Sequence, residues 1–333
     1  MDVSRRAELA TDAAGHVVHT PVMLGRIVEL LSPALAATGA VHVDATVGMA
    51  GHAAAILAAN PGARLVGIDR DADALAIAGE VLEPFTTRVT LIQARFDELD
   101  EVLDDLGLGQ INSLLADLGL SSLQVDQRQR GFAYAVDAPL DMRMDSRTER
   151  TAADVLNSAS RADLAYLLKR YGEEPHADRI ARAIVTERER QPFTTSARLV
   201  EVIAAALPAA VRHGGGHPAK RTFQALRIEV NGELDALAEL LPAALNRLTL
   251  GGRLAVLAYH SLEDRMVKQS FAAATRDAAP ERLPVVPVQL QAQFSPLTRG
   301  AEKPDAAEVA ANPRAASARL RAVQRIRPRE EHR

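Results

Sequence analysis

Val41–His52 reads VHVDATVGMAGH and decides the fold of this 333-residue chain. The apolar start predicts a buried strand, which passes through a glycine-containing turn into the helical pattern AAAILAAN. Small residues at such a turn let the backbone approach a ligand closely, and the helix N-terminus presents free N–H groups. The next predicted strand ends at Asp69, about 20 residues further on, where a carboxylate can accept hydrogen bonds from ribose hydroxyls. The segment therefore predicts an α/β unit that binds a nucleoside-bearing cofactor.

Two cofactors compete for this turn. A dinucleotide favours G-x-G-x-x-G, whereas the string here is Gly48-Met-Ala-Gly51-His. Asp44, on the strand side of the turn, would repel a pyrophosphate but would suit the amino group of S-adenosylmethionine. These residues favour S-adenosylmethionine over NAD. A purely structural tight turn between strand and helix is the third interpretation.

Further apolar runs recur along the chain, and helical stretches such as Ala72–Leu82 and Phe96–Leu106 separate the early ones. Runs that are apolar on both faces are typical of interior strands in a parallel sheet. The alternation predicts a doubly wound α/β fold. The expected strands are Val41–Ala45, Arg64–Ile68, Arg88–Ile92, Ile111–Ala116 and Arg253–Ala258.

The alternation of strand and helix patterns stops between Ala116 and Arg253. A βαβ unit needs about 30 residues or somewhat more, so this gap is too long for one crossover. Leucines spaced between Leu234 and Leu248 predict a crossover helix, and RADLAYLLKRYG, which ends at the stop signal Gly172, predicts a helix before it. We therefore expect a flexible leader over 1–18, a discontinuous α/β domain over 19–127 and 231–333, and an inserted, mainly helical domain over 128–230.

The C-terminal part is rich in arginine. From Asn312 onward it reads NPRAASARLRAVQRIRPREEHR, with seven Arg and two Glu. Such a segment is either a solvated, frayed terminus or a surface that contacts phosphates. Residues 273–310, rich in Ala, Pro and charge, predict loop and linker.

Composition excludes several classes of protein. With 47% hydrophobic and 25% charged residues, the chain is ordinary globular material. It has no apolar run of about 18 residues and no apolar stretch near its start, so we expect no membrane span and a cytoplasmic location. The absence of cysteine and of paired histidine spacing predicts no metal site. A net charge of −4 means that nucleic-acid binding would need a local basic patch.

Two further residues stand at predicted strand ends, where ligands bind in such sheets. Phe96 follows the third strand and either packs on an adenine or belongs to the core. Asp117 follows the fourth strand and is either an active-site carboxylate or a turn cap.

Taken together, eight blocks of sequence resemble the ribosomal RNA small subunit methyltransferase H family, formerly called MraW. They follow the family order from His19 to Arg321, nearly the whole chain. The blocks are HTPVM (19–23), VDATVGMAGH (43–52), DLGLSSLQVD (117–126), RGFAYAVDAPLDMRMD (130–145), YGEEPHADRIARAIV (171–185), HPAKRTFQALRIEVN (217–231), YHSLEDRMVK (259–268) and NPRAASARLR (312–321).

The resemblance implies a Rossmann-like class I methyltransferase domain with a helical insert after the fourth strand. It implies an enzyme that uses S-adenosylmethionine to methylate the exocyclic N4 of a cytidine in the decoding region of 16S rRNA in the small ribosomal subunit. It also implies cofactor contacts, which match Ala50, Gly51, His52, Asp69, Phe96, Asp117 and Gln124. The family loop usually reads G-x-G-G-H, and Ala50 replaces its middle glycine. This methyl group fits if φ of Ala50 is negative, and the turn is strained if φ is positive.

The residues offer two candidates for the group that accepts the proton of the substrate amine. Cytosine N4 is a poor nucleophile, so a group that accepts a hydrogen bond from it would assist methyl transfer. The Asp/Asn-Pro-Pro-aromatic turn of many amino-methyltransferases is replaced here by Asp117-Leu-Gly-Leu. Asp141 and His260 are the candidate catalytic residues. Each also has a structural interpretation, as an Asp–Arg pair and as a buried histidine.

A cytidine in folded rRNA must be unstacked before its N4 can react. Cations that flank the junctions of the insert are expected to line an RNA groove, although surface charge alone would explain any one of them. They are Arg128, Arg130, Arg143, Lys220, Arg221 and Arg227.

Two rival functions remain at this stage. One is a NAD-dependent oxidoreductase, and the other is a non-catalytic RNA-binding or assembly protein that keeps the cofactor pocket. The residues leave the oligomeric state open.

Overall fold

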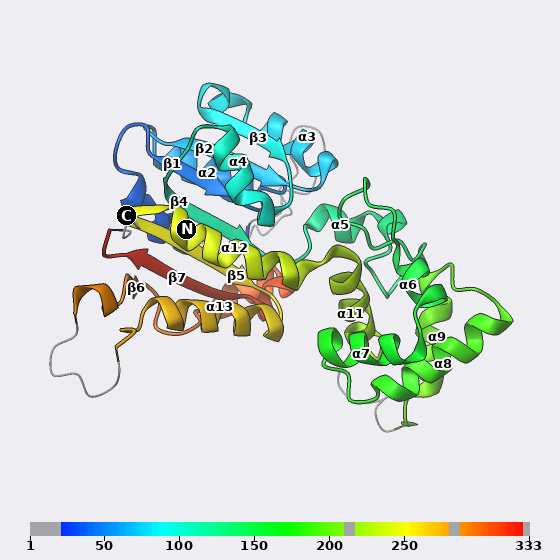
Figure 1. Ribbon diagram of the computed structural model, residues 1–333. Coiled ribbons are helices and arrows are strands. Elements are labelled where there is room, and N and C mark those ends of the chain that lie inside the picture. Colours follow the sequence, from blue (N-terminus) through cyan, green and yellow to red (C-terminus); the bar gives the residue numbers. More distant parts are fainter. Residues whose placement is uncertain (1–20, 210–216, 280–286, 329–333) are drawn as a thin grey trace, which may run out of the picture. The chain divides into compact units, whose positions relative to one another are not determined.

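The computed structural model describes residues 21–209, 217–279 and 287–328. Contacts divide the chain into two compact units, which are described separately (Figure 1). The first unit comprises residues up to Gly119 together with those from Ala236 onward, and the second comprises Leu120–Asp235. The expected leader over 1–18 lies outside the described residues.

A seven-stranded sheet forms the centre of the first unit, in the order β3-β2-β1-β4-β5-β7-β6. The first five strands are parallel, and β7 runs antiparallel to both of its neighbours. This arrangement confirms the predicted Rossmann-like α/β class. The strands are β1 Val41–Asp44, β2 Arg64–Asp69, β3 Val89–Gln93, β4 Ile111–Asp117, β5 Leu248–Ala258, β6 Phe294–Pro296 and β7 Arg319–Arg325.

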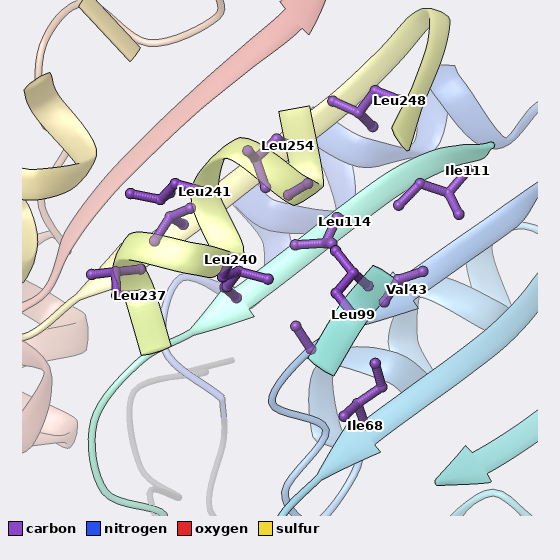
Figure 2. Packing of buried hydrophobic residues seen from close by; sticks show 14 of the residues in the cluster. Val43, Ile68, Leu99, Ile111, Leu114, Leu237, Leu240, Leu241, Leu248 and Leu254 are labelled. Atoms are coloured by element: carbon purple, nitrogen blue, oxygen red, sulfur yellow. The ribbon is translucent and has the colours of Figure 1, made fainter. Parts of the chain in front are cut away.

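Strand β4 alternates its side chains between two cores, one on each face of the sheet. Leu114 packs with Val43 of β1 and with leucines of α12 in one core (Figure 2). Leu115 packs with α1 in the other core. The helices of this unit are α1 Leu24–Leu31, α2 Gly51–Ala59, α3 Ala72–Val81, α4 Leu99–Asp105, α12 Glu233–Arg247, α13 Ser261–Ala274 and α14 Ala306–Ala311, with 3-10 turns at Ser32–Leu35, Glu83–Arg88, Phe96–Glu98, Val288–Leu290 and Pro313–Ser317. The first turn of α12 belongs to the second unit.

The structure corrects the predictions for the C-terminal part. The described part of the segment that begins at Asn312, up to residue 328, is not frayed, because β7 lies between β5 and β6. The 273–310 region is not only linker, since it contains β6 and α14. Strand β5 begins at Leu248 rather than at Arg253, because the Leu248 end pairs with Ile111 of β4.

The second unit is built mainly of helices, as expected for the insert. Its core contains buried apolar side chains from all of the longer helices, for example Leu164, Ile180 and Phe223. The helices are α5 Ser122–Asp126, α6 Ala152–Ser158, α7 Arg161–Gly172, α8 Ala177–Arg190, α9 Ser196–Ala206 and α11 Lys220–Asn231, with a 3-10 turn at Arg128–Arg130. Within the described ranges of both units, no helix has the length and apolarity needed to cross a membrane.

Candidate functional site

Three carboxylates lie at the carboxyl ends of three adjacent parallel strands. Asp44 ends β1, Asp69 ends β2 and Asp117 ends β4. Strand β1 pairs with β2 on one side and with β4 on the other, so these ends share one edge of the sheet. Ligands of open α/β sheets bind at this edge.

The turn between β1 and α2 is tied to both neighbouring strands. The Val47 backbone N–H donates to the Ile68 carbonyl oxygen of β2 at 2.9 Å. On the other side, the Asp117 backbone N–H donates to Thr46 Oγ1 at 2.7 Å. These bonds fix the turn against the sheet, so the N-terminus of the nine-residue helix α2 is a preorganised group of N–H donors.

Ala50 adopts the left-handed conformation, with φ of 64° and ψ of 20°. A non-glycine residue in this region costs about 1–2 kcal/mol. The side chain is also fully buried. The positive φ decides the question that the sequence left open: Ala50 occupies a position that favours glycine, and the turn is strained.

Gly51 is required at its position for a different reason. A Cβ atom there would lie 2.4 Å from Cγ of Pro21. Pro21 therefore packs directly against the start of α2, and any larger side chain at this position would displace it.

Asp69 faces the glycine turn. Its Oδ2 atom accepts the Gly48 backbone N–H at 2.8 Å, and its Oδ1 atom accepts the Asp71 N–H at 2.9 Å. Burial raises the pKa of Asp69, while these two hydrogen bonds act in the opposite direction. Each carboxylate oxygen keeps a further lone pair, which can accept from a ribose hydroxyl.

Asp117 is the centre of a side-chain network. Tyr259, which follows β5, donates its hydroxyl to Asp117 Oδ1 at 2.8 Å. The other oxygen, Oδ2, lies 3.5 Å from Nδ1 of His52. His52 is held from its far side, because Nε2 lies 3.0 Å from the Val22 carbonyl oxygen, to which it can only donate. Burial raises the pKa of Asp117, whereas the His52 charge and the Tyr259 hydrogen bond lower it.

Sequence reasoning missed Tyr259. Its position immediately after the strand that neighbours β4 was the available signal, since strand ends on this edge of the sheet meet.

Asp44 is the most deeply buried of the three carboxylates, with 2% of its surface exposed. Burial raises its pKa to about 8, and the charges of Asp117 and Asp69 act in the same direction. A positively charged ligand would favour the ionised form of these three carboxyl groups, whereas a pyrophosphate would raise their pKa further. S-adenosylmethionine has both a sulfonium and an ammonium group, so this set of side chains fits it better than it fits NAD.

Phe96 lies at the start of the turn that precedes α4. It packs against the sheet core, and the Arg70 guanidinium lies 5.6 Å from the centre of its ring. Phe96 can therefore be a core residue, because its ring packs in the core. It can also pack on an adenine, because it follows the end of β3.

Gln124 belongs to the second unit. It forms a capping box with Ser121, in which the Ser121 N–H donates to Gln124 Oε1 at 3.1 Å and the Gln124 N–H donates to Ser121 Oγ at 3.2 Å. This arrangement gives Gln124 a structural role at the start of α5.

Asp141, also in the second unit, makes a two-pronged ion pair with Arg143, at 2.8 Å from Nε and 2.7 Å from the terminal nitrogen. Burial acts to raise the pKa of Asp141, but the hydrogen bonds and charge of Arg143 outweigh it and hold the pKa below its usual value. Met142 between them is buried in the left-handed conformation, with φ of 60°. The loop therefore presents a rigid, ionised carboxylate.

His260, in the first unit, is the N-cap of α13. Its Nδ1 atom accepts the Glu263 backbone N–H at 3.4 Å. Its Nε2 atom lies 3.1 Å from Glu263 Oε1, without the alignment of a hydrogen bond. Both ring nitrogens thus face Glu263, which is the capping role.

The six cations expected to contact RNA all lie in the second unit, and they fall into two groups. Arg143 pairs with Asp141, Arg227 makes two 2.8 Å bonds to Glu233, and Arg130 donates to Gln127 at 2.9 Å. In contrast, Arg128, Lys220 and Arg221 are exposed, and their side chains have no ion pair or hydrogen bond with any described residue. The charges of the second group are therefore available to contact RNA phosphates.

An aromatic stack lies near Lys220, and the sequence analysis did not predict it. The rings of Tyr134 and His217 stack at 4.4 Å with an angle of 26°, and Phe223 meets Tyr134 edge-on at 5.7 Å. His217 is the exposed member of the stack.

Comparisons with known proteins identify the family of this chain. A family model described as the MraW methylase family matches residues 16–326. A ribosomal RNA small subunit methyltransferase H of Cutibacterium acnes is 59% identical over 322 residues, which cover 96% of each chain. Its namesake in Streptomyces avermitilis is 57% identical over 309 residues, covering 93% of this chain and 97% of the relative. The Nocardia farcinica relative of the same name is 55% identical over 311 residues, covering 92% and 96%. The chain therefore belongs to the MraW methylase family.

Proposed function

We propose that this protein is an S-adenosylmethionine-dependent methyltransferase that modifies the exocyclic N4 of a cytidine in the decoding region of 16S rRNA. The observation that carries the proposal is the cluster of three carboxyl groups around a glycine turn, with Asp44 buried and Asp69 and Asp117 half-buried. Family membership and relatives named as small-subunit rRNA methyltransferases support the RNA substrate. A cytoplasmic location is the corresponding proposal for an enzyme that acts on ribosomal RNA.

Residues of the first unit would hold the cofactor. Asp69 accepts from the ribose hydroxyls, Asp44 faces the ammonium group, and the N–H groups at the start of α2, from Gly51 and His52, bind the carboxylate. Phe96 packs on the adenine, and Asp117 contacts the methionine part. Gln124, which belongs to the second unit, is the remaining cofactor contact that the family resemblance implies. The cofactor supplies an electrophilic methyl group on a sulfonium. The chain supplies orientation, and alignment of this kind is worth several kcal/mol.

The acceptor amine needs a group to receive its hydrogen bond and later its proton. Asp141 and His260 are our candidates. Asp141 is ionised and rigidly held by Arg143, so it can accept a hydrogen bond from N4 without moving. Because Nδ1 of His260 accepts the Glu263 N–H, the neutral ring carries its hydrogen on Nε2. For His260 to act as the acceptor, Nδ1 would have to leave the cap and face the amine.

The insert, proposed as residues 128–230, would bind RNA. The charges of Arg128, Lys220 and Arg221, which have no partner among the described residues, can contact phosphates. The exposed ring of His217 offers a stacking surface for an unpaired base. Arg130, Arg143 and Arg227 would support the shape of this surface through their internal bonds.

Mass spectrometry of 16S rRNA from cells with and without the protein tests the proposal. A methyl group on one decoding-region cytidine should disappear in the deletion strain and return with the wild-type gene. Calorimetry separates the rivals: an oxidoreductase would bind NADH in preference to S-adenosylhomocysteine. A binding or assembly protein would leave the purified small subunit unmethylated in the presence of S-adenosylmethionine.

A further inference from the structure

Tyr259 is placed to control Asp117. Its hydroxyl donates to Asp117 Oδ1 at 2.8 Å, and a phenol has only this one proton to donate. Burial and the nearby Asp117 raise the pKa of Tyr259 well above its usual value. The hydroxyl therefore remains a donor throughout the working pH range.

The tyrosine ring itself is held firmly. Its backbone N–H donates to Glu263 Oε2 at 2.8 Å. The ring lies against Gly119, where an added Cβ would approach ring atom Cδ2 to 3.2 Å. Since the residue is held at its backbone and along its ring, the hydroxyl is a fixed point for the carboxylate.

The carboxylate would turn more freely without this bond. The χ2 torsion of aspartate is broad, and the contact on the other oxygen, from His52 Nδ1, is long at 3.5 Å. About a quarter of the Asp117 side chain is exposed (25%), so part of it is open to a ligand. The direction in which that part points depends on the Tyr259 bond.

We propose that Tyr259 is a positioning residue, which holds the Asp117 carboxylate in the orientation that the cofactor requires. This inference rests on the proposed function, because Asp117 is a cofactor contact only if the protein binds S-adenosylmethionine. In this role Tyr259 acts through Asp117, to which its hydroxyl donates.

The test is the Tyr259→Phe variant, which removes only the hydroxyl, with binding of S-adenosylhomocysteine measured by calorimetry. We expect binding to weaken roughly tenfold, which is the order expected for one hydrogen bond to a charged group. Tyr166→Phe is the matched control, since Tyr166 is 63% exposed in the second unit, and it should bind as the wild type does. Circular dichroism and urea unfolding check that the variants are folded.

A double-mutant cycle with Asp117→Asn identifies the route of the effect. If Tyr259 acts through Asp117, the weakening caused by Tyr259→Phe should largely vanish in the Asp117→Asn background. Unchanged binding by Tyr259→Phe, or an equal weakening in both backgrounds, would overturn the inference. Failure of the wild type to bind S-adenosylhomocysteine would instead overturn the proposed function, and this inference with it.

The pH profile is a second readout, which a purely structural role would not move. The titratable groups around Asp117 and Tyr259 are His52 of α2, Asp44 of β1, Glu263 of α13 and Glu308 of α14. Because the Tyr259 bond lowers the pKa of Asp117, its removal should shift the acid limb of the binding profile to higher pH. An unshifted limb in Tyr259→Phe would contradict the proposal.

Discussion

Asp69 Oδ2 accepts the backbone N–H of Gly48 at 2.8 Å, so the carboxylate proposed to hold the ribose also holds the turn beside it. Asp69→Ala leaves the N–H groups of Gly48 and Asp71 without these acceptors. We expect the free energy of unfolding to fall by about 1–3 kcal/mol, the cost of losing such acceptors. Binding of S-adenosylhomocysteine should fall as well. Urea unfolding and calorimetry measure the two effects.

Asp105→Ala is the control for this change, because Asp105 is exposed at the end of α4 and its side chain makes no hydrogen bond or ion pair with a described residue. Its stability should stay within about 0.5 kcal/mol of the wild type. If Asp69→Ala matched this control in stability, Asp69 would not support the turn.

Ala50 lets the strain of the turn be measured. Ala50→Gly removes about 1–2 kcal/mol of left-handed strain but also a buried methyl group worth about 0.8 kcal/mol. Because these effects oppose each other, we expect a stability change below about 1 kcal/mol. Ala50→Val should lose more than about 2 kcal/mol, since a β-branched side chain is poorly accommodated at positive φ.

Ala54→Gly is the matched control, because Ala54 lies inside α2, where glycine costs about 1 kcal/mol relative to alanine. Urea unfolding should therefore rank Ala50→Gly above Ala54→Gly in stability. The reverse order would show that the left-handed conformation of Ala50 stores no strain.

Local pattern was enough to predict the first five strands, because each alternates with a helix along the chain. The same pattern located Asp69 and Asp117 at strand ends. The insert was evident from the length of the gap, and the crossover helix from its leucine spacing. These features depend on neighbours in sequence.

Features that depend on distant partners were not predictable. Strand β7 is rich in arginine, yet Arg325 is buried over the Phe294 ring and bonds to the Leu245 carbonyl. Tyr259 meets Asp117 across 142 residues of sequence. The helix predicted to end at Gly172 does end there, but the left-handed residue that follows is Glu173. Gly172 itself allows the close approach of Arg221 in α11, which the sequence pattern did not indicate.

Asp44 makes stability depend on pH. Its folded pKa of about 8 exceeds the unfolded value of about 3.9. Between these values the unfolded chain loses the proton and the folded chain keeps it, so stability falls as pH rises from about 4 to about 8. The slope from this one group is at most about 1.4 kcal/mol per pH unit.

Asp44→Asn should abolish this contribution, so the variant should gain stability relative to the wild type as pH rises. Urea unfolding of both proteins at intervals from pH 5 to pH 8 gives the difference. Subtracting one profile from the other cancels the contributions of the other titratable groups. These include His42, whose pKa burial lowers to about 3. Parallel profiles for the two proteins would show that Asp44 ionises normally.

The exposed cations and the internally bonded cations of the second unit should respond differently to substitution. Replacing Arg128, Lys220 and Arg221 together by alanine should leave stability unchanged and weaken binding of a single-stranded decoding-region RNA. The slope of log affinity against log salt should decrease by about 0.7 for each phosphate that is no longer neutralised.

Arg227→Ala should destabilise the fold by a few kcal/mol, because Glu233 would keep an unpaired charge with only 7% of its side chain exposed.

His217→Ala separates stacking from charge in the same binding assay. Removing a stacking partner of a base should cost about 1–3 kcal/mol of binding free energy, while the salt slope stays that of the wild type. Equal RNA affinity for this variant and the wild type would exclude the stacking role of His217.

Asp141 and His260 can each be tested without losing their structural roles. Asp141→Asn keeps an acceptor for Arg143, and His260→Asn keeps an N-cap for α13, because asparagine is a favoured cap. If either residue receives the N4 hydrogen bond or its proton, methyl transfer to the small subunit should fall by about 10²–10⁴-fold while S-adenosylhomocysteine binding is retained. Wild-type turnover in one variant would eliminate that residue and leave the other. Wild-type turnover in both would leave Asp117 as the carboxylate at the strand end to be tested next, with Asp117→Asn.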